Sequence, residues 1–284
     1  MKPSIFRDQA VIVTGASAGI GKALALQLAC QGAKVAIAAR RAERLEQVAV
    51  ECRALGAEVL VVPTDVSNES QCKALVDTTV AAFGRLDMLI NNAGLAATAL
   101  FDEFPDLSLF RHTMDVNFYG AVYCTYYALP HLKQSRGRIV AISSMGGKSA
   151  IPYNTPYCAS KYGMHGFYDS LRMELTQHGV SVTLICPWWV VTEFHAAQLR
   201  KDGTPRGAER GRDMYTDKMM SAERCAEITL QAANKRRREV LMGPGFWAVL
   251  LKTLAPGLAD WVAVKMVLGA AIRRAKNAQE KSES

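Results

Sequence analysis

The stretch "AVIVTGASAGIGKALALQLACQG" (residues 10–32) sets the pattern for the whole chain. Its first five residues are apolar and rich in β-branched side chains, which predicts a short buried strand. A turn containing Gly15, Gly19 and Gly21 follows, and an amphipathic helical pattern then runs to Gly32. A strand, a tight glycine turn and a helix form the first half of a βαβ unit, so this stretch predicts an α/β fold.

The same alternation of apolar runs and helical patterns continues along the chain. The predicted strands are residues 10–14, 34–39, 58–63, 86–91, 138–143, 181–187 and, after a longer gap, 239–243. Their continuous apolar character is typical of strands that are covered on both faces. Strands that alternate with helices predict right-handed crossovers. We therefore expect a Rossmann-type, doubly wound parallel sheet of about seven strands flanked by helices, with ligands at the carboxyl ends of the strands.

Composition limits the domain count and the kinds of partner. The chain has 284 residues, half of them hydrophobic, and no linker-like segment divides it. We predict one domain over residues 1–243, followed by an apolar helical extension at 244–284. Most of the net charge of +8 lies in residues 200–284, which favours a local anionic contact and predicts no nucleic-acid partner.

The cysteines and the termini bear on location and metals. Seven cysteines are scattered singly, and no His/Cys group has metal-ligand spacing, so we expect no metal site and a reducing, cytoplasmic compartment. The first ten residues do not resemble a signal peptide. The sequence contains no run of 18 apolar residues, so we expect no membrane span.

The glycine turn has the chemistry of a pyrophosphate site. Glycines let backbone amides at a helix N-terminus approach phosphate oxygens, and Ser17 can add a hydroxyl donor. Arg40 and Arg41 end the second strand, where NAD-binding folds usually carry an acidic residue for the ribose 2′-hydroxyl. Positive charge there suits the 2′-phosphate of NADP, so we expect NADP(H) rather than NAD(H). Two alternatives stay open: a turn without chemical meaning, and arginines that are merely solvated at a helix start.

Several motifs in order resemble the short-chain dehydrogenase/reductase family. The resemblance covers about residues 8–243. The matching pieces are "TGASAGIG" (14–21), "NNAG" (91–94), Asn117 in "DVNFYG", Ser144 in "AISSMGG" and "YCASK" (157–161). The resemblance implies an NAD(P)-dependent oxidoreductase with a tetrad of Asn117, Ser144, Tyr157 and Lys161. It also implies cofactor contacts, which we expect from Gly15, Ser17, Gly19, Ile20, Gly21, Arg40, Arg41, Asp65, Val66, Asn91, Ala93, Tyr157, Lys161, Val190 and Thr192.

Physical chemistry supports the tetrad. Tyr157 and Lys161 are four residues apart and share a helix face. A free tyrosine has a pKa of ~10, and a neighbouring ammonium together with an oxidised nicotinamide ring would favour the phenolate. We therefore interpret Tyr157 as the general acid and base. The family implies that Ser144 holds the substrate oxygen, and that Asn117 holds a water that relays protons to Lys161. Ser143 is the competing serine, but it ends a strand and is expected to face the other way.

The segment after the sixth strand departs from the family. Where the family usually has Pro-Gly, this chain has "PWWVVT" (187–192), with Trp188 in the glycine position. Trp188 either shapes the substrate site or simply packs as a large hydrophobe; both interpretations stay open. Thr192 falls where the family places a hydroxyl on the nicotinamide carboxamide. The polar segment 188–220 is expected to form a lid over the substrate.

The apolar tail has three possible roles. Residues 245–276 form two apolar helical halves broken at Pro256-Gly257, with tryptophans and lysines interspersed. They could lie peripherally on a membrane, pack at the substrate mouth or on a second subunit, or belong to the core. We expect an enzyme that interconverts a carbonyl and a secondary alcohol on a small hydrophobic substrate that is steroid-, retinoid- or lipid-like, in a protein that could form a homo-oligomer. The alternative is a catalytically silent NADP(H)-binding sensor or scaffold.

Overall fold

One seven-stranded parallel sheet forms the centre of the molecule. The computed structural model describes residues 5–207 and 219–265. The sheet order is β3-β2-β1-β4-β5-β6-β9, the predicted parallel sheet of about seven strands is confirmed, and each strand end lies within two residues of its predicted place. The strands are β1 (Ala10–Thr14), β2 (Lys34–Ala39), β3 (Val59–Pro63), β4 (Met88–Asn91), β5 (Arg138–Ile142), β6 (Ser181–Cys186) and β9 (Glu239–Leu241).

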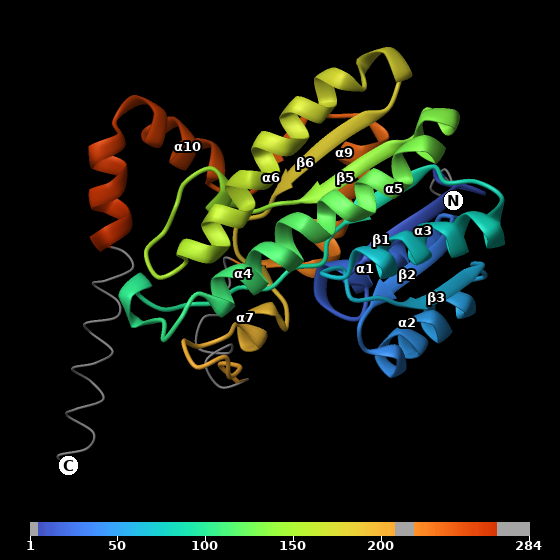
Figure 1. Ribbon diagram of the computed structural model, residues 1–284. Coiled ribbons are helices and arrows are strands. Elements are labelled where there is room, and N and C mark those ends of the chain that lie inside the picture. The colour runs from blue at the N-terminus through green and yellow to red at the C-terminus, as the bar shows by residue number, and fades with distance from the viewer. Residues whose placement is uncertain (1–4, 208–218, 266–284) are drawn as a thin grey trace.

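Helices cover both faces of this sheet (Figure 1). On one face lie α1 (Gly19–Cys30), α2 (Ala42–Ala54) and α9 (Ala222–Asn234), which pack through one buried apolar cluster. On the other lie α3 (Glu69–Phe83), α5 (Gly120–Ser135) and α6 (Thr155–Glu174), which pack through a second cluster. Because both faces are covered, the strands are mostly apolar on both sides, as the sequence pattern indicated, and charged residues stand only at strand ends, such as Lys34 and Arg138.

Local signals fix where the helices begin and end. The side chain of Asn68 accepts a hydrogen bond from the Gln71 amide and caps α3, which ends at Gly84 in the left-handed conformation. The helix α4 (Ser108–Met114) continues through a π-helical turn, Asp115–Tyr119, into α5. Such π-turns are rare and often lie at functional sites.

The order of the strands reverses between β1 and β4, and a crevice opens there at the carboxyl ends of the strands. Beyond β6 the chain forms β7 (Val190–Val191) and the short helix α7 (Phe194–Ala197), and β8 (Met220–Ser221) returns to pair with β7. The predicted lid therefore lies partly outside the described residues, since 208–218 fall within it.

The C-terminal arm (residues 245–265) projects from the body beside the loop that leads into α6 (Figure 1). It consists of α10 (Gly245–Leu254) and a second helical stretch over residues 256–265. Among the described residues, none of the helices has the length and apolar character needed to cross a bilayer. The rest of the predicted extension, from residue 266 on, lies outside the described part of the chain.

Candidate active site

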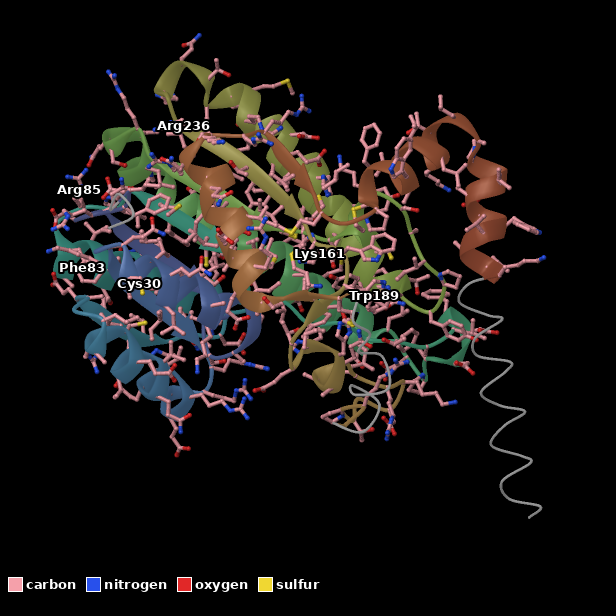
Figure 2. The ribbon with its side chains drawn as sticks, turned by 180° about the vertical axis from the view of Figure 1, so that it is seen from behind. Cys30, Phe83, Arg85, Lys161, Trp189 and Arg236 are labelled. Carbon is pink, nitrogen blue, oxygen red and sulfur yellow. The ribbon has the colours of Figure 1, made fainter. Side chains whose placement is uncertain are left out.

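A cavity of about 1580 Å³ opens at the carboxyl ends of the strands. Ligand sites usually measure roughly 300–1,000 Å³, so this cavity has room for more than one small molecule. One end, the glycine-turn end, is lined by the β1–α1 turn. The other, the tyrosine end, is lined by Tyr157, the predicted lid and the C-terminal arm. Figure 2 places Lys161 and Trp189 on the side of this arm, and Cys30 and Phe83 at the opposite edge of the molecule.

The glycine turn needs its glycines for two different reasons. Gly15 and Gly19 have φ angles of +66° and +55°, a region that favours glycine, and both line the cavity. A β-carbon on Gly19 would lie 3.1 Å from side-chain carbons of Thr192, so the turn closely faces that residue. Gly21 does not line the cavity; a β-carbon there would lie 2.2 Å from the carbonyl oxygen of Gly15, so its role is close packing of α1.

Positive charge surrounds the adjacent part of the cavity. Arg40 and Arg41 line it, and Arg41 Nη2 donates to Ser17 Oγ over 3.2 Å. Asp65 Oδ1 accepts hydrogen bonds from the Ser67 amide and hydroxyl. Burial acts to raise the pKa of Asp65, but these bonds and the charge of Arg40 outweigh it and lower the pKa. The carboxylate is therefore ionised and available as an acceptor.

The predicted cofactor residues divide into two groups. Most of them line the cavity: Gly15, Ser17, Gly19, Ile20, Arg40, Arg41, Asp65, Val66, Ala93, Tyr157, Lys161, Val190 and Thr192. Asn91 does not, because its side chain points into the core, where Nδ2 donates to Tyr168 OH at 2.8 Å and Thr125 Oγ1 at 3.0 Å. Its neighbour Asn92 lines the cavity and donates to the carbonyl oxygen of Thr14 over 2.9 Å.

Tyr157 and Ser144 meet at the tyrosine end. Ser144 Oγ accepts from the Gly146 amide over 3.0 Å and is hydrogen-bonded to Tyr157. Lys161 Nζ lies 5.8 Å from the centre of the Tyr157 ring and donates to the carbonyl oxygen of Ile142 over 2.8 Å. Ser143, the competing serine, also lines the cavity, but its Oγ lies 3.0 Å from His165 Nε2.

Burial dominates the protonation of both titratable groups. It raises the pKa of Tyr157 to about 12, although the hydrogen bond with Ser144 acts in the opposite direction. It lowers the pKa of Lys161 to about 8. At neutral pH the phenol is therefore protonated and neutral, whereas Lys161 still holds its proton but releases it more readily than a free lysine. The expectation that the ammonium would lower the phenol's pKa is not met in the cofactor-free protein, because burial is the largest influence on this pKa and raises it.

Asn117 lies in the π-helical turn and is almost fully buried. Its Nδ2 donates to the carbonyl oxygen of Leu95 and to Ser160 Oγ, each over 2.9 Å, and its Oδ1 accepts from the Leu95 amide. A β-carbon on Gly94 would lie 3.2 Å from Asn117 Oδ1 and 3.8 Å from Lys161 Nζ. The amide and the ammonium thus share the small space left by this glycine, and all four predicted tetrad residues lie in one region.

Comparisons with known proteins identify the family of this chain. The family model described as short chain dehydrogenase matches residues 9–203. The chain belongs to the short-chain dehydrogenase/reductase family. It is accordingly an NAD(P)-dependent oxidoreductase that acts on CH–OH groups, with a nicotinamide dinucleotide as cofactor. The cradle fits that group, because the glycine turn opens at the N-terminus of α1, whose first turn carries no acidic residue.

Individual relatives agree with this assignment. The 11-beta-hydroxysteroid dehydrogenase of Pinus massoniana is 38% identical over 88% of this chain and 72% of its own length. The 11-beta-hydroxysteroid dehydrogenase-like 2 of Arabidopsis thaliana is 36% identical over 89% of this chain and 79% of its own length. A short-chain dehydrogenase/reductase from Burkholderia phymatum, solved in complex with NAD, has a TM-score of 0.79 at 28% identity and covers 89% of this chain and 95% of its own. A short-chain dehydrogenase/reductase from Caenorhabditis elegans, solved with cofactor, has a TM-score of 0.78 at 27% identity. The match covers 86% of this chain and 97% of that protein.

Trp188 distinguishes this short-chain dehydrogenase/reductase from the usual family pattern. Its side chain is half-buried and lines the cavity, so it contributes to the site. It also packs on the turn after β9, because a β-carbon on Gly243 would lie 3.0 Å from Trp188 Cβ. Both interpretations of Trp188 are thus compatible with its position.

The sequence offered the substrate mouth as one position for the tail, but it did not single out the residues that line it. Phe194 on α7 lines the cavity, and its ring centre lies 5.9 Å from that of Tyr157. Trp247, Leu251 and Val262 of the C-terminal arm also line it. The arm therefore lies at the cavity mouth, and within α10 only Gly245 is buried, so the core interpretation is wrong for this helix. The apolar periodicity of the arm was visible in the sequence, but not the direction in which its faces point.

Proposed function

We propose that this enzyme is an NADP(H)-dependent reductase and dehydrogenase that interconverts a carbonyl and a secondary alcohol on a hydrophobic substrate. One observation carries the proposal: a single cavity joins the basic, glycine-lined end to Tyr157, which is hydrogen-bonded to Ser144, and then to an apolar mouth. A nucleotide binder without chemistry would need the first part of this arrangement but not the paired phenol and hydroxyl.

The side chains divide the chemistry among themselves. The bound nicotinamide supplies or accepts the hydride. Tyr157 donates its proton to the carbonyl oxygen during reduction and takes a proton from the alcohol during oxidation. Ser144 holds that oxygen beside the phenol, and Lys161, supported by Asn117, replenishes the proton. Because burial keeps Tyr157 protonated at neutral pH, the resting protein is prepared for the reductive direction.

Two exposed arginines support NADP(H) over NAD(H). Arg40 and Arg41 line the cavity directly after β2, where the adenosine ribose is bound in this fold. The bond from Arg41 to Ser17 holds one guanidinium across the glycine turn. A planar guanidinium can bind a 2′-phosphate through two charge-assisted hydrogen bonds.

A hydrophobic substrate is supported by the mouth and by the relatives. Trp188, Phe194 and Trp247 line the part of the cavity beyond Tyr157. The relatives from Pinus massoniana and Arabidopsis thaliana carry the name 11-beta-hydroxysteroid dehydrogenase, and a steroid-like or other lipid-like ketone suits such a lining.

The outer face of the C-terminal arm exposes Phe246, Leu254 and Trp261. A peripheral membrane contact and a second copy of the chain are the two hypotheses for this face. Flotation with liposomes and light scattering of the full chain distinguish them, since only the membrane hypothesis predicts flotation and only the second predicts a doubled mass.

The test of function is NADPH oxidation with a panel of hydrophobic ketones. We expect turnover with the native chain and a loss of about 10²–10⁴-fold in kcat for Tyr157→Phe. Tyr162→Phe is the matched control, because Tyr162 lies on the same helix, is exposed and donates only to a backbone carbonyl. Full turnover by Tyr157→Phe would refute the mechanism, whereas cofactor binding without turnover in the native chain would favour the silent sensor or scaffold.

A further inference from the structure

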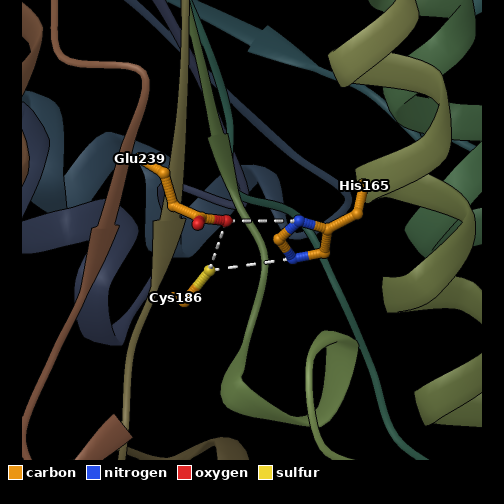
Figure 3. Close-up of side chains that lie close together, drawn as sticks. All are labelled: His165, Cys186 and Glu239. Carbon is orange, nitrogen blue, oxygen red and sulfur yellow. Dashed lines mark hydrogen bonds and ion pairs between the residues drawn. The ribbon is translucent and has the colours of Figure 1, made fainter. Parts of the chain in front are cut away.

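Three metal-ligand side chains meet behind the tyrosine end of the cavity (Figure 3). His165 comes from α6, Cys186 from the end of β6 and Glu239 from the start of β9. The proposed oxidoreductase chemistry uses none of them. Because Cys186 lies 21 residues from His165 and 53 from Glu239, their spacing in the sequence predicted no metal site.

The atoms of this His/Cys/Glu cluster lie close together. His165 Nδ1 is 3.4 Å from Glu239 Oε1, and Cys186 Sγ is 3.8 Å from the same oxygen. One ligand atom from each residue lies within 4.8 Å of the other two. Bond lengths to zinc place the ligand atoms of a tetrahedral site about 3.3–3.6 Å apart. Side-chain rotations of about 1 Å are therefore sufficient to bring all three atoms to one ion.

One ring nitrogen of the cluster faces the Glu239 carboxylate without forming a hydrogen bond among the described residues. His165 is only 7% exposed, and its Nδ1 is buried without a hydrogen-bond partner among the described residues. The other ring nitrogen, Nε2, lies 3.0 Å from Ser143 Oγ. When Nε2–H donates to this hydroxyl, Nδ1 presents its lone pair to a carboxylate oxygen. In this tautomer a cation is needed beside the two facing acceptors; Lys148 Nζ, 2.8 Å from Glu239 Oε1, fills this role, and a metal ion between the acceptors can replace it.

We propose that His165, Cys186 and Glu239 bind one divalent transition-metal ion, with zinc as the best match. Imidazole, thiolate and carboxylate are together the ligand types that zinc accepts. A histidine that binds zinc almost always donates its other N–H to a nearby oxygen, as His165 would to Ser143. A water molecule completes the four-coordinate site.

The charges balance without an unpaired group. As the metal–sulfur bond forms, the thiol of Cys186 releases its proton to solvent, and the resulting thiolate and the Glu239 carboxylate neutralise the dication. Lys148 Nζ lies 2.8 Å from Glu239 Oε1 and is partly exposed, so it can move to the second carboxylate oxygen. Lys148 then stays close to the ion, and its charge weakens the binding of any cation.

The bound ion would act as a structural clip. His165 lies one helical turn beyond Lys161, and Cys186 directly precedes Pro187 and Trp188. The ion therefore joins the helix that carries Tyr157 to the strand end from which the predicted lid departs. It touches neither substrate nor cofactor, so this inference holds whether or not the proposed substrate class is right.

Cobalt(II) and zinc(II) binding to the full-length protein tests the proposal. After chelator treatment, we expect one ion per chain and, with cobalt, the near-ultraviolet absorption that a thiolate–cobalt bond produces. Cys186→Ser should abolish that absorption, and His165→Gln should weaken zinc binding at least tenfold in competition with a chromophoric chelator. Cys30→Ser, which removes an exposed thiol far from the cluster, should change neither.

A second variant separates a metal site from a purely structural cluster. Lys148→Gln leaves the three ligands intact and removes a positive charge, so zinc should bind several-fold more tightly. If the ligand variants fail to fold, X-ray absorption of the zinc-loaded native protein should show one sulfur among nitrogen and oxygen neighbours. Substoichiometric binding, cobalt spectra without the sulfur band, or zinc affinity that Lys148→Gln leaves unchanged would each overturn the proposal and leave an adventitious ion only.

Discussion

Replacing Lys161 by methionine should remove activity and yet stabilise the fold at neutral pH. Lys161 is 4% exposed, and burial lowers its pKa from 10.5 to about 8. A shift of one pKa unit corresponds to about 1.4 kcal/mol, so keeping this ammonium charged in the fold costs about 3 kcal/mol. Methionine has a similar length and carries no charge, so the substitution removes that cost.

The gain is partly offset. Lys161 Nζ donates to the carbonyl oxygen of Ile142 over 2.8 Å, and losing this bond costs about 1–2 kcal/mol. The net effect near pH 7 is therefore a stabilisation of about 1–2 kcal/mol. Loss of the buried hydrogen bond alone would instead lower the stability of the variant.

The effect should change sign with pH. The folded-state pKa of Lys161 is lowered, so below about pH 8 both states hold the proton and the full cost of the buried charge is present. Between about pH 8 and 10.5 the folded lysine releases its proton while the unfolded lysine keeps it, and the cost disappears. Above this window Lys161→Met should be less stable than the native chain by the lost hydrogen bond.

Urea unfolding of the cofactor-free protein near neutral pH and near pH 10.5 measures this difference. The matched control is Lys73→Met, because Lys73 is exposed and its ion pair with Asp77 should be worth less than about 1 kcal/mol at either pH. If Lys161→Met is destabilised equally at both pH values, the prediction fails, because the buried ammonium would then not lower the stability of the native protein. NADPH oxidation by the same variant should fall sharply.

Three further outcomes test the nucleotide site and the core. Arg41→Ser should lower the ratio of kcat/KM for NADPH to that for NADH about tenfold, as expected for one lost charged hydrogen bond, while Arg53→Ser on the same helix leaves the ratio unchanged. Gly21→Ala places a β-carbon 2.2 Å from the carbonyl oxygen of Gly15. It should therefore weaken NADPH binding in a fluorescence titration and lower the unfolding free energy by about 1–3 kcal/mol. Normal NADPH binding would contradict this prediction. Tyr168→Phe removes a fully buried hydroxyl with hydrogen-bonded partners and should cost about 1–2 kcal/mol in urea unfolding, with kcat unchanged.

The sequence predicts the sheet and the tyrosine end well, because both depend on local periodicity. Continuous apolar runs define strands that are covered on both faces, and the four-residue spacing of Tyr157 and Lys161 places them on one helix. The family pattern assigns Ser144, and strand alternation argues only against Ser143. The same rule, applied to "NN" at the end of β4, would have placed Asn91 with Leu89 in the core and Asn92 at the cavity.

Other features depend on contacts between distant segments. The sign of the pKa shift at Tyr157 follows from how deeply α6 and its neighbours bury the phenol, and motif spacing contains no measure of that burial. The His/Cys/Glu cluster joins α6, β6 and β9, which are separated in the sequence. The apolar arm shows a helical period, but only its packing indicates that Trp247 and Val262 face the cavity mouth.

One helix and one pair of serines connect the tyrosine end with the His/Cys/Glu cluster. Along α6, Tyr157 and His165 are eight residues apart, and each step of four residues turns the side chain by about 40°. Tyr157 therefore faces the cavity, whereas His165 faces the residues that follow β5, where its Nε2 lies 3.0 Å from Ser143 Oγ. Ser143 and Ser144 directly follow β5, and both meet side chains of α6: Ser144 bonds Tyr157, while Ser143 contacts His165. A slip of one residue in β5 would break both contacts at once, so the position of the phenol's partner and that of the His/Cys/Glu cluster depend on the same strand register.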